Sequence, residues 1–370
     1  MRSRICELLD VKYPIVGFTP SPQVAAAISR AGGLGVLGAI RYTAIEELEE
    51  ALAWMDANVD GKPYGLDIVM PTKFGGGDDL GALEAMIDER HKRFVEDVLS
   101  RFNVPDLPAG ADRPSAITGW MHSFARAQVE AALRHPVKLL ANALGSPPAD
   151  VIAQAHERGI LVAALAGRAK HALAHKEAGV DIVVAQGYEA GGHTGEITTM
   201  VLVPEVVSAV SGLPVLAAGG IGTGAQIAAA LALGADGVWL GSVWLTSAEY
   251  EVEPRTESGY GVVTEKLLRA TSSDTVRSRV ISGKPARMLK TAWTEAWEAP
   301  GSPGTLPMPL QGMLVAEAEA RIRLHRSREL LGTPVGQIVG QMNEVRPVAQ
   351  IMERLVAELG EARKRLAEHD

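Results

Sequence analysis

The sequence predicts an α/β protein of the (β/α)8, or TIM-barrel, class. Eight short and almost continuously apolar segments alternate with amphipathic helical segments, as is typical of parallel strands that are buried on both faces. Eight is the number of strands that closes such a sheet into a barrel. Glycine-rich turns follow the last two strands, whereas the cofactor loop of an open, doubly wound sheet normally follows its first strand. We therefore favour the barrel over the open sheet.

The first two repeats show the pattern. A strand at residues 14–17 precedes an alanine-rich helix at 21–31, which ends at a pair of glycines. A second strand at 34–37 precedes a helix at 43–58. Thr43 is the expected N-cap of that helix, because a glutamate stands three residues later in the capping-box position. The remaining strands are expected at residues 64–70, 137–141, 160–165, 181–185, 215–218 and 237–240.

Two regions depart from the repeat. A helical insertion follows the third strand, with helices expected around residues 83–102 and 122–134, and a helical extension follows the eighth strand, with helices near 314–331 and 345–359. Insertions after a strand end of a barrel rise over its active face. We expect a barrel formed by residues 1–71 and 136–245, completed by a C-terminal helix around 345–360, and a roofing or substrate region formed by residues 72–135 and 246–340.

The central motif follows the sixth strand and occupies residues 186–195, with the sequence QGYEAGGHTG. Gly191 and Gly192 directly precede His193, which is expected on a loop. Because glycine has no Cβ, the backbone there can approach a flat ligand closely. A lone histidine in a loop is more often a structural residue, but two adjoining glycines at a strand end favour a functional one.

Two more glycine turns follow the seventh and eighth strands. The first spans residues 219–224 and leads into a helix, and the second is Gly241-Ser242. Free backbone N–H groups at successive late turns are how a β/α barrel holds a phosphate. A tight strand-to-helix turn is the structural alternative for the first. A dinucleotide fingerprint also fits the string, but Asp236 precedes the next strand instead of ending it, which disfavours that interpretation.

Charge and composition narrow the class of partner. The formal net charge is −8 with scattered lysines and arginines, whereas nucleic-acid binding needs clustered positive charge, so a small-molecule substrate is expected. Cys6 is the single cysteine and can form no internal disulfide, and neither a signal peptide nor a membrane-spanning run is apparent, which favours a cytoplasmic location. His171 and His175 lie four residues apart without an apparent third ligand, so no metal is expected. Both a monomer and a homo-oligomer are compatible with the sequence.

Four segments together resemble the signature segments of the FMN-dependent nitronate monooxygenases, formerly called 2-nitropropane dioxygenases. They are residues 186–195, 217–222, 230–238 and 241–245. The resemblance extends over residues 25–38, 283–297 and 336–355 and is weak over 72–135. The histidine segment is the most specific of these, and the alanine-rich helix is generic.

The resemblance implies that FMN lies across the C-terminal mouth of the barrel. The backbone near Gly219, Gly220, Gly241 and Ser242 would hold its phosphate. The residues implied beside the isoalloxazine ring are Phe18, Thr19, Asp67, Gln186, Gly191 and Gly192. The family often has asparagine where Asp67 stands, and a carboxylate, which only accepts hydrogen bonds, would change the tuning of the flavin unless it is protonated. It also often has arginine in the segment where Val243 stands, so phosphate binding here would depend more on backbone N–H groups.

His193 is the candidate catalytic residue. A neutral imidazole, with an ordinary pKa of about 6.5, can accept a proton from the carbon next to a nitro group. The activity implied by the resemblance is then oxidation of the nitronate by O2, giving a carbonyl compound and nitrite, with the flavin carrying the redox step. An NAD(P)H-dependent reductase of quinones or enoyl thioesters on the same barrel is the alternative. A non-catalytic flavin- or phosphate-binding subunit is a more remote one.

Overall fold

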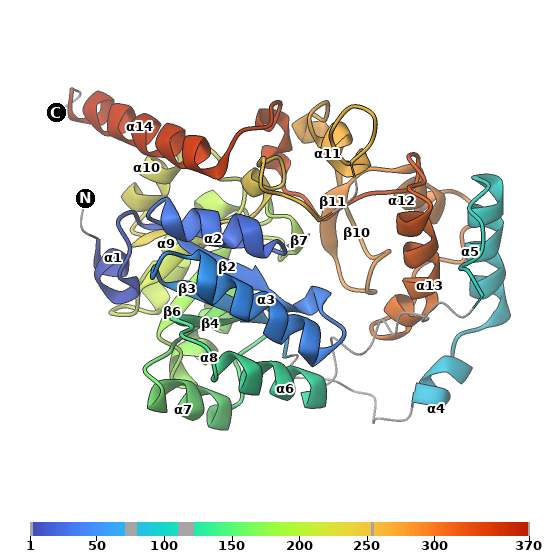
Figure 1. Ribbon diagram of the computed structural model, residues 1–370, viewed down its shortest axis with the longest axis horizontal. Helices are drawn as coiled ribbons and strands as arrows, with labels where there is room; N and C mark the ends of the chain where they lie inside the picture. The colour runs from blue at the N-terminus through green and yellow to red at the C-terminus, as the bar shows by residue number, and fades with distance from the viewer. Residues whose placement is uncertain (1–2, 71–79, 110–121, 253–254, 369–370) are drawn as a thin grey trace.

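The computed structural model describes residues 3–70, 80–109, 122–252 and 255–368. Eight parallel strands close into a barrel in the order β1-β2-β3-β4-β5-β6-β8-β9, which confirms the predicted fold class (Figure 1). Strand order follows chain order, as the short βα repeats require. The barrel strands are β1 (Ile15–Thr19), β2 (Leu34–Gly38), β3 (Tyr64–Ile68), β4 (Leu139–Asn142), β5 (Leu161–Ala166), β6 (Ile182–Gln186), β8 (Val215–Ala218) and β9 (Gly237–Leu240).

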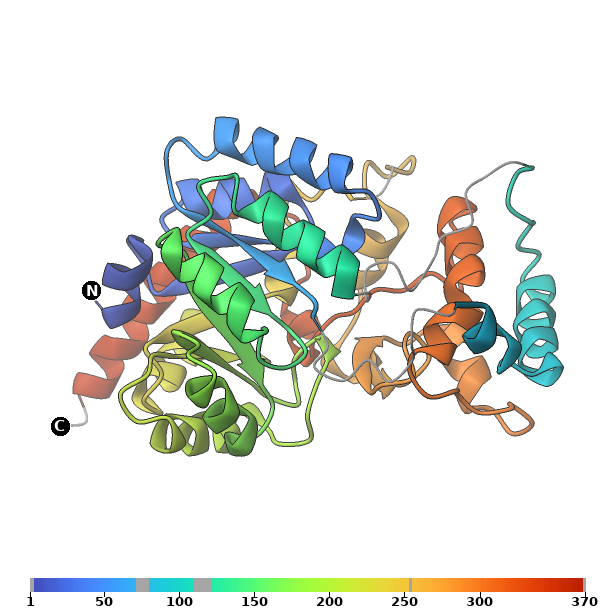
Figure 2. The ribbon, with the colours of Figure 1, turned by 90° about the horizontal axis from the view of Figure 1, so that it is seen from below.

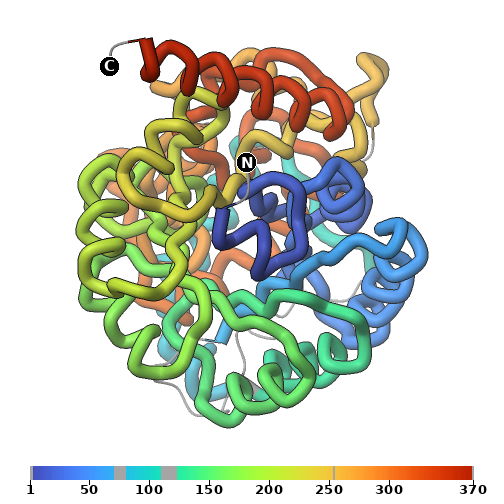
Figure 3. The backbone as a smooth tube through the Cα atoms, turned by 90° about the vertical axis from the view of Figure 1, so that its left-hand side faces the viewer, coloured from blue at the N-terminus to red at the C-terminus, as the bar shows by residue number. Residues whose placement is uncertain are grey.

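Helices surround the barrel, and Figure 3 shows them as a ring around its N-terminal end. Two apolar layers result, because alternate strand residues face opposite sides. Val16, Val36 and Val184 belong to the inner cluster. Helix α1 covers the N-terminal end of this cluster with Ile5 and Leu9. The helices of the barrel are α1 (Arg4–Leu9), α2 (Pro22–Arg30), α3 (Ile45–Asn58), α6 (His122–Ala132), α7 (Ala149–Glu157), α8 (Ala169–Glu177), α9 (Thr199–Ala209), α10 (Gly224–Ala232) and α14 (Val348–Ala367).

The start of α3 differs from the prediction. Its N-cap is Ala44, with no side-chain cap, and not Thr43. Leu48, Leu52 and Met55 are fully buried in the outer cluster, so packing on the barrel stabilises this helix without a capping box. The start of α10 does have a capping box, between Thr223 and Gln226.

A second unit stands beside the C-terminal end of the barrel strands (Figures 1 and 2). It has a three-stranded antiparallel sheet in the order β10-β11-β7. Trp293 and Trp297 pack in its core with Val95 and Val315. The elements of this unit and its connections are α4 (Leu80–Ala85), α5 (Glu89–Arg101), β7 (Gly192–His193), η3 (Ser242–Trp244), α11 (Val262–Leu267), η4 (Ser272–Asp274), β10 (Thr275–Ser278), β11 (Ala286–Leu289), α12 (Ala292–Glu298), α13 (Leu310–Leu324) and η5 (Gln337–Gln341).

The insertion after β3 contributes to both units. Where one helix is predicted around residues 83–102, the structure has two, α4 and α5. Arg321 of α13 donates hydrogen bonds to Glu96 of α5 at 3.0 and 2.9 Å, which joins α5 to the second unit. Helix α6 instead packs on α3 and β3, with Ala125 and Val129 buried in the outer barrel cluster. In the described part of the chain, no helix combines the length and apolarity needed to cross a membrane.

Candidate active site

Three side chains predicted to contact the flavin point into the mouth of the barrel. Phe18 stacks on the inward-facing Trp239, with ring centroids 6.4 Å apart. Asp67 lies between Leu66 and Ile68, which face the outer cluster, so Asp67 faces inward. Gln186 lies two residues beyond the inward-facing Val184 at the end of β6. The alternation of each strand therefore brings these three residues to the C-terminal end of the barrel interior.

Thr19 has a different environment. It alternates with Phe18 along β1, is buried, and its Oγ1 accepts a hydrogen bond from the Ser21 amide at 3.2 Å. Its hydroxyl thus stabilises the turn from β1 into α2.

Asp67 is buried with only 6% of its surface exposed. Among the described residues, nothing hydrogen-bonds its Oδ1 atom. Burial raises the pKa of Asp67 to about 8, because the charged form loses its hydration without gaining a partner. The carboxyl group is consequently neutral at pH 7.

The glycines of the mouth fall into two groups. A Cβ on Gly192, where φ is +79°, would meet no atom within 4 Å, and a Cβ on Gly241 would meet only Phe18 Cδ1, at 3.9 Å. The backbone at both positions therefore borders open space. In contrast, a Cβ on Gly191 would lie 2.8 Å from the Gly336 amide nitrogen, and one on Gly219 would lie 2.9 Å from Thr199 Oγ1. Close packing of the protein itself therefore requires glycine at these two positions.

The turn after β8 presents a limited set of amide donors. The amides of Gly222 and Thr223 donate to Gln226 Oε1, and the Gly224 amide donates to Glu358 Oε2 at 2.7 Å. Gly219 and Gly220 have positive φ values of 105° and 68°. The engaged amides are not those predicted to hold a phosphate, which are the amides of Gly219, Gly220, Gly241 and Ser242.

Ser242 also links the mouth to the segment before η5. Its Oγ accepts a hydrogen bond from the Gly336 amide at 2.8 Å, and the backbone carbonyl of Glu189 accepts one from the Gln337 amide at 2.9 Å. The segment before η5 therefore crosses the ends of β6 and β9, next to the candidate phosphate donors.

His193 lies on strand β7 and not on a loop, which corrects the prediction. The register pairs His193 with Ala286 of β11. Its Nε2 atom is 2.7 Å from Ser282 Oγ. Desolvation, together with the positive charge of Lys284, lowers the pKa of His193 to about 4, so the imidazole is neutral at pH 7. Part of its surface remains accessible, as a base requires.

A pair of arginines clamps the histidine segment. The guanidinium of Arg287 is 4.5 Å from the centroid of the Tyr188 ring, and its Nε donates to the Tyr188 carbonyl at 3.1 Å. Arg277 lies 5.6 Å from the same ring and donates to Thr194. Ser282, Arg277 and Arg287 were not singled out from the sequence. They lie more than 80 residues from the motif in the chain. Of the three, only Arg287 falls within the wider resemblance over 283–297.

Two alternative interpretations of sequence motifs have structural explanations. The carboxylate of Asp236 accepts a hydrogen bond from the Val215 amide at 3.0 Å, at the N-terminal end of the barrel, away from the glycine turn. Both ring nitrogens of His175 are engaged, by Ser146 Oγ at 2.8 Å and the Leu165 carbonyl at 3.0 Å. Within the described ranges, no group of three or more His, Cys, Asp or Glu side chains could hold a metal.

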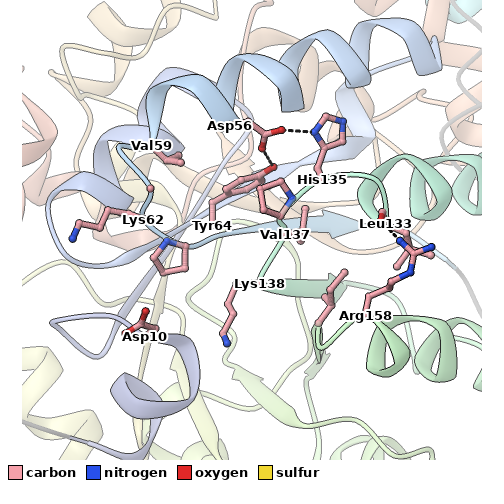
Figure 4. A pocket seen from close by; sticks show the side chains of 14 residues that line it. Asp10, Asp56, Val59, Lys62, Tyr64, Leu133, His135, Val137, Lys138 and Arg158 are labelled. Carbon is pink, nitrogen blue, oxygen red and sulfur yellow. Dashed lines mark hydrogen bonds and ion pairs between the residues drawn. The ribbon is translucent and has the colours of Figure 1, made fainter.

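A cavity of about 490 Å³ opens at the opposite, N-terminal end of β3, β4 and β5 (Figure 4). Tyr64 donates to Asp56 at 2.6 Å, and His135 lies between Asp56 at 2.6 Å and Glu49 at 2.8 Å. Burial alone would lower the pKa of His135, but these carboxylates raise it. Active sites of β/α barrels form at the C-terminal face, and this paired network is accordingly structural.

The mouth of the barrel fits a flavin. Open space at Gly192 and Gly241, the unpartnered oxygen of Asp67 and the turns at Gly219 and Gly220 together match a planar ring with a phosphate tail. A neutral histidine stands beside it. The fold and the site are those of a β/α barrel whose mouth can hold a flavin.

The chain belongs to the nitronate monooxygenase family, whose family model matches residues 2–358. It is 49% identical over 372 residues to a Mycobacterium tuberculosis protein provisionally named a monooxygenase, covering 97% of this chain and 96% of that one. It is 32% identical to a Staphylococcus saprophyticus protein provisionally named a nitronate monooxygenase, covering 78% and 79% of the two chains. A solved nitroalkane oxidase from Streptomyces ansochromogenes superimposes with a TM-score of 0.78 at 28% identity, covering 98% and 99%. The family resemblance seen in the sequence is thus confirmed.

Proposed function

We propose that this protein binds FMN and oxidises alkyl nitronates with O2 to carbonyl compounds and nitrite. Nitroalkanes become substrates after His193 removes the proton from the carbon next to the nitro group. The observation that carries this proposal is a neutral imidazole, held by Ser282 at 2.7 Å, beside the open surface of Gly192. Family membership and the likeness to a nitroalkane oxidase support the substrate class.

Eight residues would hold the cofactor. Phe18, Asp67, Gln186 and Gly192 would border the ring, and Gly219, Gly220, Gly241 and Ser242 would meet the phosphate end through their backbone. FMN, when bound, supplies the electron acceptor and the reaction with O2. The capping of α10 by Gln226 and Glu358 leaves a single short cluster of amide donors, which suits the one phosphate of FMN.

His193 would act on the neutral substrate only. Its low pKa keeps it unprotonated at pH 7 and therefore able to accept a proton. As the proton leaves carbon, the electron pair moves onto the nitro group, and this negative charge favours the imidazolium beside it. A substrate that is already a nitronate needs no such step.

Substitution His193→Asn tests the role of the base. Activity with a nitroalkane should fall by about 10²-fold or more, while activity with the pre-formed nitronate should fall much less. FMN content should stay normal, because asparagine keeps polarity and similar size. Steady-state kinetics on nitroethane and ethyl nitronate measure both. Equal losses on the two substrates would reassign His193 to substrate binding.

Anaerobic mixing of the oxidised FMN enzyme with single reductants tests the reaction class. Propyl-2-nitronate should bleach the flavin absorbance rapidly, and NADH or NADPH should not. Rapid bleaching by a nicotinamide, with none by the nitronate, contradicts the proposal and indicates the reductase instead.

A further inference from the structure

The carboxyl group of Asp67 faces the mouth of the barrel where no described cation can neutralise it. Gly38 of β2 and Ala141 of β4 lie beside it in register. The other seven barrel strands contain no ionisable side chain. Strand β7 in the second unit carries His193, which is neutral at pH 7. Arg277 and Arg287 of the neighbouring strands donate to Thr194 and Tyr188. An ionised Asp67 would therefore be a buried charge without a counter-charge among the residues that the structure describes.

Cations on the elements that pack outside β3 are engaged elsewhere. Arg41 of η1 (Ala39–Arg41) donates to the Pro20 carbonyl at 2.9 Å, and Arg126 of α6 pairs with Asp150. Arg30 of α2 donates to the Asn58 carbonyl. All three are exposed on the outer surface, whereas Asp67 points into the barrel.

We propose that Asp67 meets the bound flavin as a neutral carboxylic acid and donates a hydrogen bond to an acceptor atom of the ring. This inference rests on the proposed binding of FMN. A carboxylate only accepts hydrogen bonds, whereas a carboxylic acid has one O–H donor, as the amide of asparagine has N–H donors. The acid form also places no negative charge beside a ring that must take up electrons. Asp67 would then donate a hydrogen bond to the ring, as the amide of asparagine would, but only in its protonated form.

The electrostatics give the direction of the pH dependence. Burial raises the pKa of Asp67 from 3.8 to about 8 before any ligand binds. A covering ring removes more water, and the donated hydrogen bond exists only in the neutral form, so both effects raise the pKa further in the complex. Above about pH 8, FMN binding must therefore be accompanied by uptake of a proton. Its affinity should be constant below that pH and fall by about tenfold per pH unit above it.

The test is titration of the apoprotein with FMN between pH 7 and 10, followed by quenching of flavin fluorescence. The FMN phosphate stays fully ionised over this range, since the second pKa of a phosphate monoester is about 6. Wild-type protein should show a Kd that rises above pH 8, and the absorption bands of the bound flavin should shift with pH. The Asp67→Asn variant should bind within a few-fold of wild type at pH 7 and lose both pH effects. The Asp67→Leu variant, which lacks the donor, should bind more weakly at every pH.

The outcomes separate this inference from the proposed function. A wild-type Kd with the same pH profile as Asp67→Asn overturns the role of Asp67 and leaves FMN binding intact. A wild-type affinity that increases with pH also overturns it, because Asp67 would then bind as an anion. If folded wild-type protein, judged by circular dichroism, binds no FMN at any pH, the cofactor proposal and this inference fall together. Should the variants misfold, the wild-type profile alone still decides.

Discussion

We propose that Ser282 helps to orient the His193 ring. Its hydroxyl lies 2.7 Å from Nε2 and is itself buried, with 4% of the residue exposed. We expect Ser282→Ala to lower kcat/KM for a nitroalkane by about 10- to 150-fold, because one hydrogen bond to a group that becomes charged contributes about 1.5–3 kcal/mol. Activity on the pre-formed nitronate and FMN content should change little. Steady-state kinetics on both substrates measure the difference.

Ser278 provides a matched control on β10 of the same sheet. It is equally buried, but its hydroxyl donates to Glu298 at 3.1 Å, away from the histidine. Ser278→Ala should leave the ratio of the two activities unchanged. If both serine variants lower both activities alike, Ser282 supports the sheet and does not orient the base.

Strand β7 is only two residues long, and we expect its stability to depend on the contacts of Arg287. Arg287 lies on β11 opposite Gly192, stacks on Tyr188 and donates to its carbonyl. Arg287→Met keeps the length but removes the charge, the cation–π contact of about 1–2 kcal/mol and the hydrogen bond. We expect faster amide hydrogen exchange over residues 186–194 and a loss of nitroalkane activity of about tenfold or more. The variant Lys290→Met, which removes an exposed cation just beyond the same strand, is the control and should show neither change. Unchanged exchange in Arg287→Met would show that β7 is held without the clamp.

The C-terminal helix α14 completes the layer of helices around the barrel. It packs on α10 and α2, and Val348, Ile351 and Leu355 join a second apolar cluster, which covers the outer faces of β6, β8 and β9. The contact with α10 is so close that a Cβ on Gly224 would lie 2.1 Å from the Leu359 amide nitrogen and 2.4 Å from the Leu355 carbonyl oxygen. The last helix is thus part of the core although it follows β9 by more than 100 residues.

Gly224→Ala should therefore destabilise the protein by about 1–3 kcal/mol, the usual cost of overpacking a close contact. Gly360 lies within α14, where a Cβ would meet nothing within 4 Å. Gly360→Ala should accordingly stabilise the protein, by up to about 1 kcal/mol, because alanine is the better helix former. Equilibrium urea unfolding measures both changes. A neutral Gly224→Ala would mean that α14 moves away from α10 at little cost.

Local patterns in the sequence were sufficient for the barrel. Each strand of the barrel is a short apolar run buried on both faces, and such a run is visible without knowledge of its neighbours. All eight predicted strands overlap observed ones, from 14–17 with β1 to 237–240 with β9. The cap predicted at Thr43 was wrong because burial of Leu48 and Leu52, and not the capping box, stabilises α3.

The site needed the tertiary structure wherever its partners are distant in the chain. The glycines around His193 and the further glycine turns after the last strands are visible in the sequence. Only the fold decided that His193 forms a strand with β11, that Ser282 and Arg287 reach it, and that Gly191 is small because it packs on Gly336. The neutral states of His193 and Asp67 also follow only from the fold. A pKa depends on burial and on nearby charges, and the sequence shows neither.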